Sequence, residues 1–586
     1  MPMKKAAVII QEKDAESALK ILRQLGILHL EPQRIPKSKE PNEIQNDIAL
    51  VEASLSILSE TEFKSSIEQP AIEDLPDWQA VSRHIIDLKK RLEHLEQFSR
   101  NLKNIISQWE KWGDFDTDKI HELAKNNIFI RFYRIPHKEF KKLPDNILVK
   151  IIFNVDGIAN CLVVSREKCD IGFKELVLPH CGLEKMRLRL QEDVEIIKSI
   201  EREIGKFEPY FNVFTKAKKN LIKELEFQQA LSGMAQEWQL NYLMGYIPYD
   251  KVKILTETAK KEKWGLVITQ PAENDNVPTL IRNPRWVAII APVFKLIEIF
   301  PGYREVDISM LFLVFLSIFF GMLIGDAGYG AIFLFLTIFA RIKTKKKIKD
   351  KSIFILFYVF SGCAIIWGGL SATFFGQEWL PQSIKPLVPG LRDSATVQTI
   401  CFLLGTFHLS LGHIWRFILK MPSLIAWVEI GWLCILWGMF FLARNLILSA
   451  VFPAFAKWFF IIGPVLVVLF SNPQKNILKG IGAGLGNLLL NFVNNFTDVV
   501  SYIRLFAVGL ATVAVADAFN KMAMDVGYNS LVSAVTASLI LLLGHGLNIV
   551  LGPMAVLVHG VRLNVLEFCN HINVKWQGFV YKPIQE

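Results

Sequence analysis

The pattern of hydrophobic and polar positions changes near Pro301 and divides the chain into two halves. Before Pro301, apolar residues alternate with many charged ones, as in a water-soluble domain. After it, apolar runs long enough to cross a bilayer follow one another with short gaps. The pattern predicts a cytoplasmic α+β domain over residues 1–300, followed by a polytopic α-helical membrane domain over residues 301–586.

Two long helices are predicted in the N-terminal half. Over Trp78–Trp112, and again over Leu183–Phe211, apolar residues recur every three or four positions with charges between them. This is the pattern of a coiled-coil seam. Pro209 must kink or end the second helix, because proline removes a backbone hydrogen bond and clashes with the preceding turn. The two seams predict an antiparallel coiled-coil hairpin.

Short strand and helix patterns at the two ends of this hairpin predict two small α/β lobes. One lobe combines the start of the chain with a later segment that returns beside it, and the other lies between the two seams. The elements expected in the first lobe are strands Lys4–Ile10 and Ile27–Leu30, helix Asp14–Leu25, strand Tyr242–Ile247, helix Lys251–Lys261 and strand Gly265–Thr269. Those expected in the second are strands Ile128–Tyr133, Leu148–Phe153 and Cys161–Ser165.

The first apolar region of the membrane half, Val306–Ala340, is too long for one crossing. At about 1.5 Å per residue it would form a helix of about 50 Å, whereas the hydrocarbon core is about 30 Å thick. The run Gly325–Gly330 in its middle contains glycines and Asp326 and allows a turn. Because the basic run Arg341–Lys351 that follows favours the cytoplasmic side, the region should cross twice. We expect a tight helical hairpin formed by Ile308–Ile324 and Tyr329–Ala340.

Further apolar segments bring the expected number of transmembrane helices to about eight, which places both termini in the cytoplasm. The segments are Ile353–Phe375, Ala395–Phe417, Leu424–Leu446, Val451–Phe470, Asn494–Asp517 and Leu531–Arg562. Basic residues fall in the loops thereby assigned to the cytoplasm, namely Arg416 with Lys420 and Lys475 with Lys479. The proline-rich loop Gln377–Arg392 is expected outside, and Gly480–Leu490 is expected to be a short interfacial helix.

Composition and charge exclude several classes of function. The net charge of +10 is modest for 586 residues, and cytoplasmic loops explain it, so nucleic-acid binding is not expected. The apolar stretch near the start is too short for a signal peptide, which favours a cytoplasmic N-terminal half. Cys161, Cys169 and Cys181 lack metal-type spacing. Because no G-x-x-x-x-G-K-[ST] run or other nucleotide fingerprint occurs, the chain is not expected to be an enzyme by itself or to hold a cofactor or metal.

Arg504 lies inside an apolar helical pattern, in the stretch NNFTDVVSYIRLFAVGL from Asn494 to Leu510. A guanidinium in a bilayer costs about 3 kcal/mol even on lenient insertion scales, so it usually faces a partner charge or a wet cavity. Small residues share its helix face and would let another helix come close or slide past. These residues are Ala507, Ala511, Ala514 and Ala518, with Ser501 and Thr497 behind the arginine. The alternative is an arginine paired with a structural acid in its own bundle.

Polar residues also share one stripe of the last helix, because they follow one another at steps of three and four. The stripe comprises His545, Asn548, Gly552, Ala555, His559 and Arg562, and Glu567 lies slightly more than one turn beyond. Imidazole titrates near neutral pH and an amide can hold water, so this stripe is a candidate proton path. Pro553 favours a bend in the helix. The alternative is a polar seam that joins this helix to the one bearing Arg504.

Four motifs resemble the a (or I) subunit of V-type and archaeal A-type rotary ATPases. They are SYIRLFAVGL at Ser501–Leu510, GHGLNIVLGPMAVLVHGVRLNVLEF at Gly544–Phe568, FFGMLIGDAGYG at Phe319–Gly330 and WGGLSATFFG at Trp367–Gly376. The resemblance extends to Tyr246–Pro248, Leu280–Pro284 and Pro301–Asp307, and it covers essentially the whole chain in the expected order. The compact length is more similar to prokaryotic members.

The resemblance implies a stator subunit in a prokaryotic plasma membrane. Its N-terminal domain would hold the peripheral stalks, of the E/G type, and its membrane domain would pack against a rotating ring of c (or K) subunits that carry a carboxylate in mid-membrane. A central-stalk socket subunit (C/d type), the soluble ATPase sector and the lipid bilayer would be further partners. The complex would couple movement of H⁺ or Na⁺ to ATP hydrolysis or synthesis. Neither the ion nor the direction follows from the sequence.

The resemblance also implies roles for individual residues. Arg504 would be the essential arginine that meets the rotor carboxylate, with Arg562 supporting the same exchange site. The candidates for the ion half-channels are His545, Asn548, His559, Ser501, Glu567 and Asp326. Asp326 could either conduct or anchor its turn. Gly552 occupies a position where eukaryotic relatives tend to carry glutamate, so their proton route cannot be copied to this chain.

Two other classes of protein would explain part of this sequence pattern. A secondary ion transporter with a cytoplasmic coiled-coil domain would also place charges in mid-membrane, but the sequence shows no paired repeat of broken helices. A membrane-anchored coiled-coil scaffold would explain the long seams but not the arginine on an alanine stripe.

Overall fold

The computed structural model describes residues 1–31, 40–60, 77–142, 147–155, 157–167, 171–344, 351–376, 386–471 and 477–585. Contacts within the chain divide it into two units. One unit comprises Met1–Ala6, Tyr246–Thr258 and Ile268–Lys582, and the other comprises Ala7–Gly245, Ala259–Val267 and Pro583–Glu586. Most of the basic run Arg341–Lys351, most of the loop Gln377–Arg392 and the side chains of Lys475 and Lys479 lie outside the described residues.

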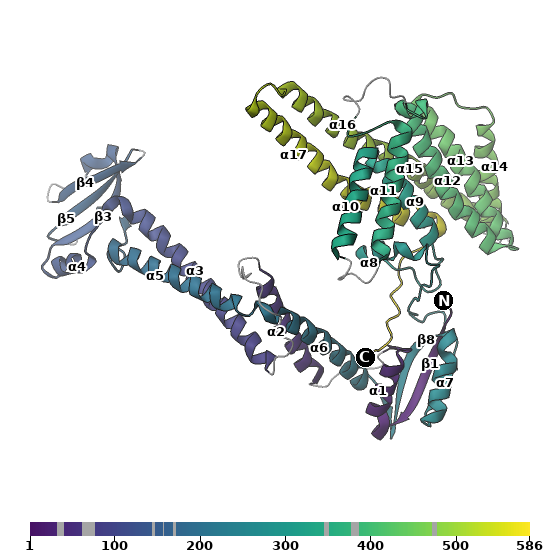
Figure 1. The fold of residues 1–586 in the computed structure, drawn as a ribbon, viewed down its shortest axis with the longest axis horizontal. Coiled ribbons are helices and arrows are strands. Elements are labelled where there is room, and N and C mark those ends of the chain that lie inside the picture. Colours follow the sequence, from purple (N-terminus) through teal and green to yellow (C-terminus); the bar gives the residue numbers. More distant parts are fainter. Residues whose placement is uncertain are drawn as a thin grey trace. The chain divides into compact units, whose positions relative to one another are not determined.

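The N-terminal sheet has the strand order β2-β8-β1-β9, and β7 pairs with β8 (Figure 1). Its strands are β1 (Met3–Gln11), β2 (His29–Glu31), β7 (Ala235–Glu237), β8 (Leu240–Pro248) and β9 (Gly265–Thr269). Helix α1 (Ala15–Leu25) ends at Gly26, whose φ of 58° provides the left-handed cap that glycine adopts without strain. Helix α7 (Val252–Lys261) lies between β8 and β9 in the sequence. Because β8 lies beside β1, the predicted return of the chain to its start is confirmed.

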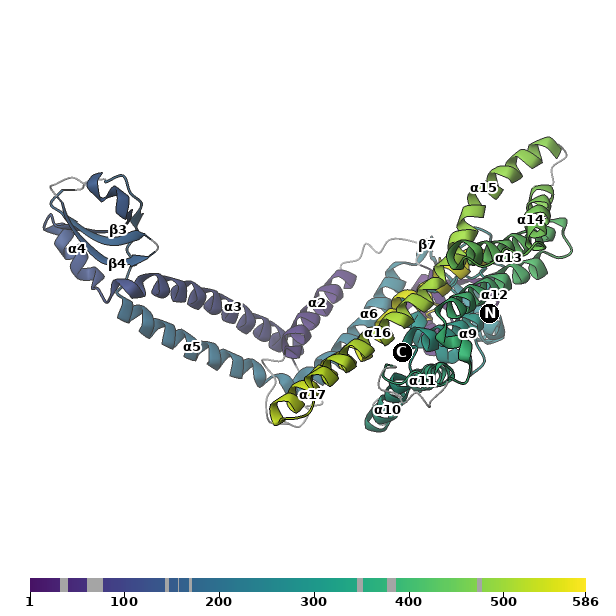
Figure 2. The same cartoon turned by 90° about the horizontal axis from the view of Figure 1, so that it is seen from above.

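Long helices pack in pairs between the two sheets in the sequence. Helix α3 (Trp78–Trp109) packs along α5 (Leu183–Gly205), and α2 (Glu40–Ser59) packs along α6 (Phe211–Ser232) (Figure 2). Trp109 shares one apolar cluster with Leu183, whereas Ile85 shares another with Ile204, so α3 and α5 are antiparallel. Pro209 lies in the 3₁₀ turn Glu208–Tyr210, where α5 gives way to α6. The predicted hairpin and its proline break are confirmed, and the α2–α6 pair extends it.

The second lobe is built on a sheet with the strand order β4-β5-β3-β6. The strands are β3 (Phe129–Pro136), β4 (Leu148–Val155), β5 (Ile158–Ser165) and β6 (Glu175–Leu176), and helix α4 (Thr117–Lys125) precedes them. Phe132 on β3 packs edge-on against Trp109 and Trp112, with ring centroids 5.1 and 5.2 Å away. These aromatic contacts join the sheet to the end of α3. The predicted strands of this lobe are confirmed.

The C-terminal half is an all-helical bundle, as predicted. Within the described ranges, six helices are long and apolar enough to span a membrane, and α9 and α14 are shorter apolar helices. The helices are α9 (Ser309–Ile324), α10 (Ala327–Thr344), α11 (Ser352–Ser371), α12 (Ser394–Lys420), α13 (Trp427–Leu448), α14 (Ala456–Phe470), α15 (Ile477–Ser501), α16 (Ile503–Val526), α17 (Leu531–Ala555) and α18 (Cys569–Ile572). The predicted spans fall on helical segments, so the polytopic membrane fold is confirmed; Asn494–Asp517 covers the end of α15 and the start of α16, and Leu531–Arg562 runs past the end of α17.

The predicted helices on either side of Asp326 and the turn between them are confirmed, but the two helices do not pack closely against each other. The chain turns at Gly325, whose φ is 67°, but α9 and α10 both pack mainly against α11. A Cβ on Gly321 would lie 2.8 Å from the Cys363 carbonyl oxygen, and one on Gly368 would lie 2.0 Å from the Ala327 nitrogen. The glycines therefore let α11 approach both helices at backbone distance, a closer fit than the α9–α10 contact provides.

Two predicted helix boundaries also need correction. Gly480–Leu490 is not a separate interfacial helix, because α15 continues through it to Ser501; glycines within a helical pattern are tolerated and need not end it. The last helix does not remain α-helical to Arg562. Helix α17 ends at Ala555, and π-helical turns follow at Val556–Gly560 and Leu563–Phe568. Each π turn carries an additional residue, so the stripe with steps of three and four loses its register beyond Ala555.

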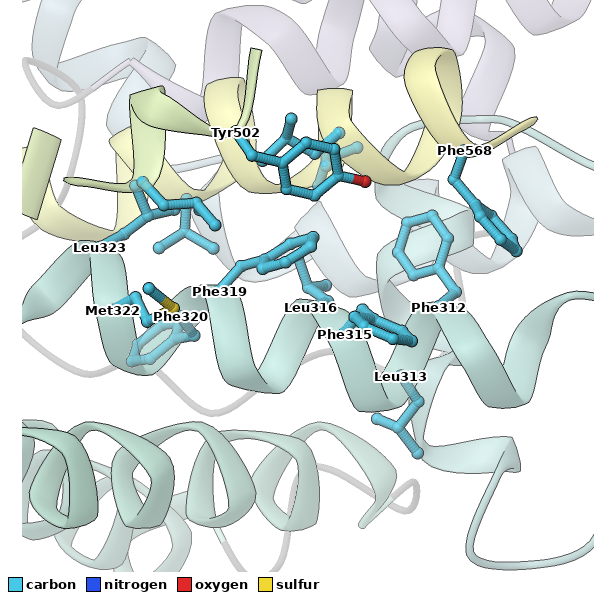
Figure 3. Close-up of a cluster of buried hydrophobic side chains, with 14 of the residues drawn as sticks. Phe312, Leu313, Phe315, Leu316, Phe319, Phe320, Met322, Leu323, Tyr502 and Phe568 are labelled. Atoms are coloured by element: carbon cyan, nitrogen blue, oxygen red, sulfur yellow. The ribbon is translucent and has the colours of Figure 1, made fainter. Parts of the chain in front are cut away.

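Helix α9 lies at the centre of the membrane bundle. Its buried aromatic side chains include Phe312, Phe315 and Phe319, which lie close to Tyr502 and Phe568 from much later in the chain (Figure 3). Phe319 meets Tyr502 edge-on at 5.9 Å between ring centroids. The apolar core therefore fixes the segment that carries Arg504.

Candidate functional site

Arg504 lies in the first turn of α16, directly after a break in the helix at Tyr502. Helix α15 ends at Ser501 and α16 begins at Ile503. The Arg504 Nε donates to the Ser501 carbonyl oxygen at 2.9 Å. Ser501 and Thr497 therefore do not belong to the same unbroken helix as Arg504, which corrects the expected stripe at its N-terminal end. At such a break the carbonyl oxygens of the first helix can bind side chains instead of backbone.

Tyr502 is fully buried and holds this break in place. Its hydroxyl is 2.8 Å from Nδ1 of His408 on α12. The His408 ring stacks between Phe315 and Phe568, with centroid distances of 3.7 and 4.2 Å. Gly405 gives the Tyr502 ring its space, because a Cβ there would lie 2.4 Å from the ring. The position of Arg504 thus depends on an aromatic stack that the sequence motifs did not indicate.

The Arg504 guanidinium forms an ion pair with Glu567 in the second π-helical segment. Nε of Arg562 lies 3.6 Å from the same carboxylate oxygen, Oε1. The Glu567 side chain is 6% exposed, whereas those of Arg504 and Arg562 are 22% and 56% exposed. One buried carboxylate is therefore shared by two arginines whose side chains are more exposed than it is. Glu567 was expected in a half-channel, and its contacts make it the counter-ion of both arginines.

The predicted alanine stripe lies on the open side of α16. Ala507, Ala511, Ala514 and Ala518 are all exposed. Helices α16 and α17 lie side by side along their length (Figures 1 and 2). The stripe thus leaves a smooth face of small side chains next to Arg504, suited to close approach by another helix.

His545 and Asn548 meet α10 and α16 in what we call the His545 cluster, formed by Tyr329, Asn520, His545 and Asn548. His545 Nδ1 lies 2.7 Å from the Tyr329 hydroxyl, and its Nε2 lies 3.0 Å from Asn520 Oδ1. The Asn548 amide donates to the same hydroxyl at 3.1 Å and to the Thr512 carbonyl oxygen at 3.0 Å. The stripe thus serves partly as the polar seam that the sequence left open, and it links helices through titratable and amide groups.

Asp326 is fully buried at the start of α10. Its carboxylate accepts hydrogen bonds from the backbone N–H groups of Gly328, Tyr329 and Gly376, at 2.7, 3.1 and 3.1 Å. Three backbone donors to one carboxylate form a helix cap and fasten the turn after α11. These contacts favour the anchoring role for Asp326 over conduction.

A second polar group, the His571 cluster, was not predicted and comprises His413, Glu429, Asp498 and His571. His413 Nδ1 lies 2.8 Å from Glu429 Oε2, and its Nε2 lies 2.9 Å from His571 Nδ1. His571 Nε2 lies 3.0 Å from Asp498 Oδ2. The four groups come from α12, α13, α15 and α18, so no sequence spacing could reveal them. The available signal was the presence of ionisable residues within apolar spans, which by itself suggests function.

Two pockets lie in the membrane bundle, one at the His571 cluster and one along α16. A pocket of about 600 Å³ lies at the His571 cluster, and its walls include Asn491, Asn494, Asn495, Thr497, Asp498 and Asn570. Asn495 Oδ1 is buried with no hydrogen-bond partner among the described residues, which favours water in this pocket. A second pocket of about 210 Å³ reaches from Arg392 and Ser394 past Asp517 to Ala514 on the alanine stripe. His559 lies in the first π-helical turn and belongs to neither cluster.

Several relatives match this chain over most or all of its length. A V-type ATP synthase subunit I of Borreliella burgdorferi is 32% identical, covering 100% of this chain and 99% of the relative. The chain belongs to the subunit I family of V-type ATP synthases. The V-type ATP synthase subunit I 1 of Treponema pallidum is 28% identical and covers 100% of both chains. An A-type ATP synthase subunit I of Methanocaldococcus jannaschii is 26% identical over 56% of this chain and 52% of its own.

No family model matches the chain. The crystal structure of the cytoplasmic N-terminal domain of a subunit I, homolog of subunit a, of V-ATPase covers 45% of this chain and 99% of its own, at 18% identity and a TM-score of 0.24. The subunit I assignment made from the motifs is confirmed by the full-length relatives, so the chain is a membrane subunit of a V/A-type rotary ATPase.

In this member of the subunit I family, we expect Gly405→Ala to disturb the Arg504 site through Tyr502. The added Cβ would lie 2.4 Å from the Tyr502 ring and must displace it. Overpacking of this kind costs about 1–3 kcal/mol. The apparent melting temperature of the purified protein should therefore fall. Gly362→Ala is the matched control, because a Cβ at that helical position meets nothing within 4 Å; equal melting temperatures for both variants would contradict the proposed packing role.

Proposed function

We propose that this chain is the stator ion channel of the rotary ATPase and that Arg504 is its exchange arginine. The observation that carries this proposal is the position of the Arg504–Glu567 pair. It lies at the edge of the exposed alanine stripe, with the His571 cluster on one side along the helices and the His545 cluster on the other. The chain hydrolyses nothing itself and acts through the assembled complex.

The chemistry follows from the cost of a charge in lipid. A rotor carboxylate can cross the lipid face only when H⁺ or Na⁺ neutralises it, because an unpaired buried charge is expensive. Beside Arg504 the ionised carboxylate is favoured, and its ion is released. Arg562 supports the same site. Because Arg504 separates the two polar clusters, ions reach one from the other only on the rotor, and transport requires rotation.

The two clusters then serve as half-channels on opposite sides of Arg504. Arg416 and Lys420 flank Glu429 in the His571 cluster at 3.0 and 2.6 Å, and basic residues favour the cytoplasmic side. The His571 cluster and its pocket therefore form the cytoplasmic half-channel. The His545 cluster, with the pocket that reaches Ala514, forms the outer one. This orientation places both termini in the cytoplasm of a prokaryotic cell.

The remaining partners are assigned to the two predicted domains. Residues 1–300 form the stator arm that holds peripheral stalks of the E/G type and faces the central-stalk socket subunit of the C/d type. Residues 301–586 form the membrane domain, whose alanine stripe meets the c/K rotor ring. The soluble ATPase sector is joined through these subunits.

The experiment that tests this function compares the assembled complex with the chain alone. The complex is isolated through a tag on this chain, placed in sealed vesicles and supplied with ATP, while uptake of H⁺ and of ²²Na⁺ is followed. We expect copurification of a small hydrophobic rotor subunit and ATP-driven uptake of one ion. Vesicles holding this chain alone should be inactive. Transport by the chain alone would instead support the secondary transporter.

We expect Ala514→Trp to block rotation without harming the fold. Ala514 is exposed on the stripe and borders the outer pocket, so a large ring there obstructs either a helix docked on this face or the pocket beside it. ATP-driven uptake should fall at least about tenfold, because small residues are what permit close helix approach. Ile461→Trp on α14 is the matched control, since Ile461 is 53% exposed on another helix. Native uptake by Ala514→Trp would show that the stripe does not face the rotor.

A further inference from the structure

The exchange site contains more positive than negative charges. Arg504 and Arg562 contribute two positive charges, and Glu567 contributes one negative charge between them. Both arginines approach the same oxygen, Oε1, whereas Oε2 is buried without a hydrogen-bond partner among the described residues. The pair of arginines is therefore only half neutralised by the chain's own carboxylate.

Arg504 has guanidinium N–H groups left over for a further partner. A guanidinium has five N–H donors, and Arg504 uses two of them for the Ser501 carbonyl oxygen and Glu567. The Glu567 side chain is 6% exposed, so the carboxylate lies behind the guanidinium and not in front of it. A second carboxylate that approaches along the alanine stripe can bind Arg504 from the open side while Glu567 stays in contact.

The groups around Glu567 leave this imbalance in place. His559, in the first π-helical turn, is within electrostatic reach of both arginines and supplies no negative charge. The Tyr502 hydroxyl is paired with His408. Asp498 is paired with His571 and belongs to the His571 cluster. One positive charge thus remains, which is the amount that one ionised rotor carboxylate neutralises.

We propose that Glu567 is a resident counter-ion that sets how strongly Arg504 holds the rotor carboxylate. This rests on the proposed role of Arg504 in ion exchange. With Glu567 ionised, Arg504 has a second partner to which it can return, so the rotor carboxylate is released when its ion arrives. Without Glu567 the site carries two uncompensated positive charges and retains the rotor carboxylate. Glu567 is in this sense a positioning residue, because it acts on the rotor through Arg504.

The sign of the effect can be worked out from charge. In Glu567→Gln, the additional positive charge favours the ionised rotor carboxylate and lowers its pKa by about 1 unit or more. Release then requires a higher proton concentration. Coupled ATP hydrolysis by the intact complex should slow about tenfold near neutral pH, and its pH profile should move about one unit toward acid. Arg562→Gln removes one positive charge and should move the profile the opposite way.

The decisive variant restores the charge without restoring the carboxylate. In the double variant Glu567→Gln/Arg562→Gln, the site again carries one positive charge, on Arg504. We expect its pH profile to return to within a few tenths of a unit of the native one, and its rate to exceed that of Glu567→Gln. A purely structural role for Glu567 predicts the reverse, since the double variant loses two side chains instead of one. Glu262→Gln, at an exposed position, is the matched control.

The outcomes separate this inference from the proposed function. If the double variant is no faster than Glu567→Gln, or if neither single variant moves the pH profile, Glu567 does not tune Arg504 and the inference is wrong. If Glu567→Gln fails to assemble, as judged by copurification of the rotor subunit, the double variant is compared with Arg562→Gln, because these two differ only in the Glu567 carboxylate. We expect the pH profile of the double variant to lie about one unit toward acid of that of Arg562→Gln, and equal profiles would overturn the inference. Failure of the proposed function would appear differently, as normal coupled uptake when Arg504 itself is replaced.

Discussion

Arg504→Ala is expected to abolish ATP-driven ion uptake by the assembled complex while the complex itself survives. An opposite charge in contact lowers the pKa of a carboxyl group by about 1–3 units. Without Arg504 the rotor carboxylate has no site at which ionisation is favoured, so uptake should fall by at least about 100-fold. Assembly should be retained, because Glu567 keeps Arg562 at 3.6 Å as a partner. Uptake into vesicles, with copurification as the test of assembly, measures both.

Two further variants make this prediction specific. Arg341→Ala removes an exposed arginine at the end of α10 and should leave uptake unchanged. Arg504→Lys should recover only part of the activity, because an ammonium group keeps the charge but lacks the planar fork that serves Ser501 and Glu567 together. Uptake near the native rate in Arg504→Ala would make Arg504 structural and would remove the basis of the proposed function.

Local periodicity was sufficient to predict most of the fold. The seams of α3 and α5, the break at Pro209 and the strands of both lobes follow from spacings of two, three and four residues, which the backbone geometry imposes. The packing of α9 and α10 on α11 did not follow from spacing. It depends on glycines such as Gly321 and Gly368 that meet backbone atoms of a neighbouring helix, and one sequence does not show which helices become neighbours.

The sequence predicted individual residues of the site but not the contacts between them. Arg504 and the alanine stripe were visible because a charge and small residues stand out in an apolar pattern. The partnership of Arg504 with Glu567 was hidden by the π-helical turns, which change the register of the last helix. The His571 cluster joins His413 to His571 across 158 positions of sequence. Contacts of that separation are set by tertiary packing and leave no local period.

Glu429→Ala is expected to cause the largest loss of stability among the polar residues of the bundle. Glu429 is 1% exposed and binds His413, Arg416 and Lys420 at 2.8, 3.0 and 2.6 Å. Removing one partner of a buried ion pair costs about 3–5 kcal/mol, because the remaining charges lose their compensation. The apparent melting temperature of the detergent-solubilised protein should fall clearly. Glu262→Ala, at an exposed position, should leave it unchanged.

The isosteric variant Glu429→Gln separates support of the fold from ion movement. The three contacts along Asp498, His571, His413 and Glu429 need one hydrogen each, but two neutral imidazoles supply only two N–H groups. One further hydrogen must therefore lie along this chain of contacts, and the Glu429 carboxylate provides a negative charge at one end of it. Glutamine preserves the shape and an acceptor but not this charge. We expect uptake to fall several-fold with a smaller change in melting temperature than in Glu429→Ala. Native uptake in Glu429→Gln would restrict the His571 cluster to holding α12, α13, α15 and α18 together.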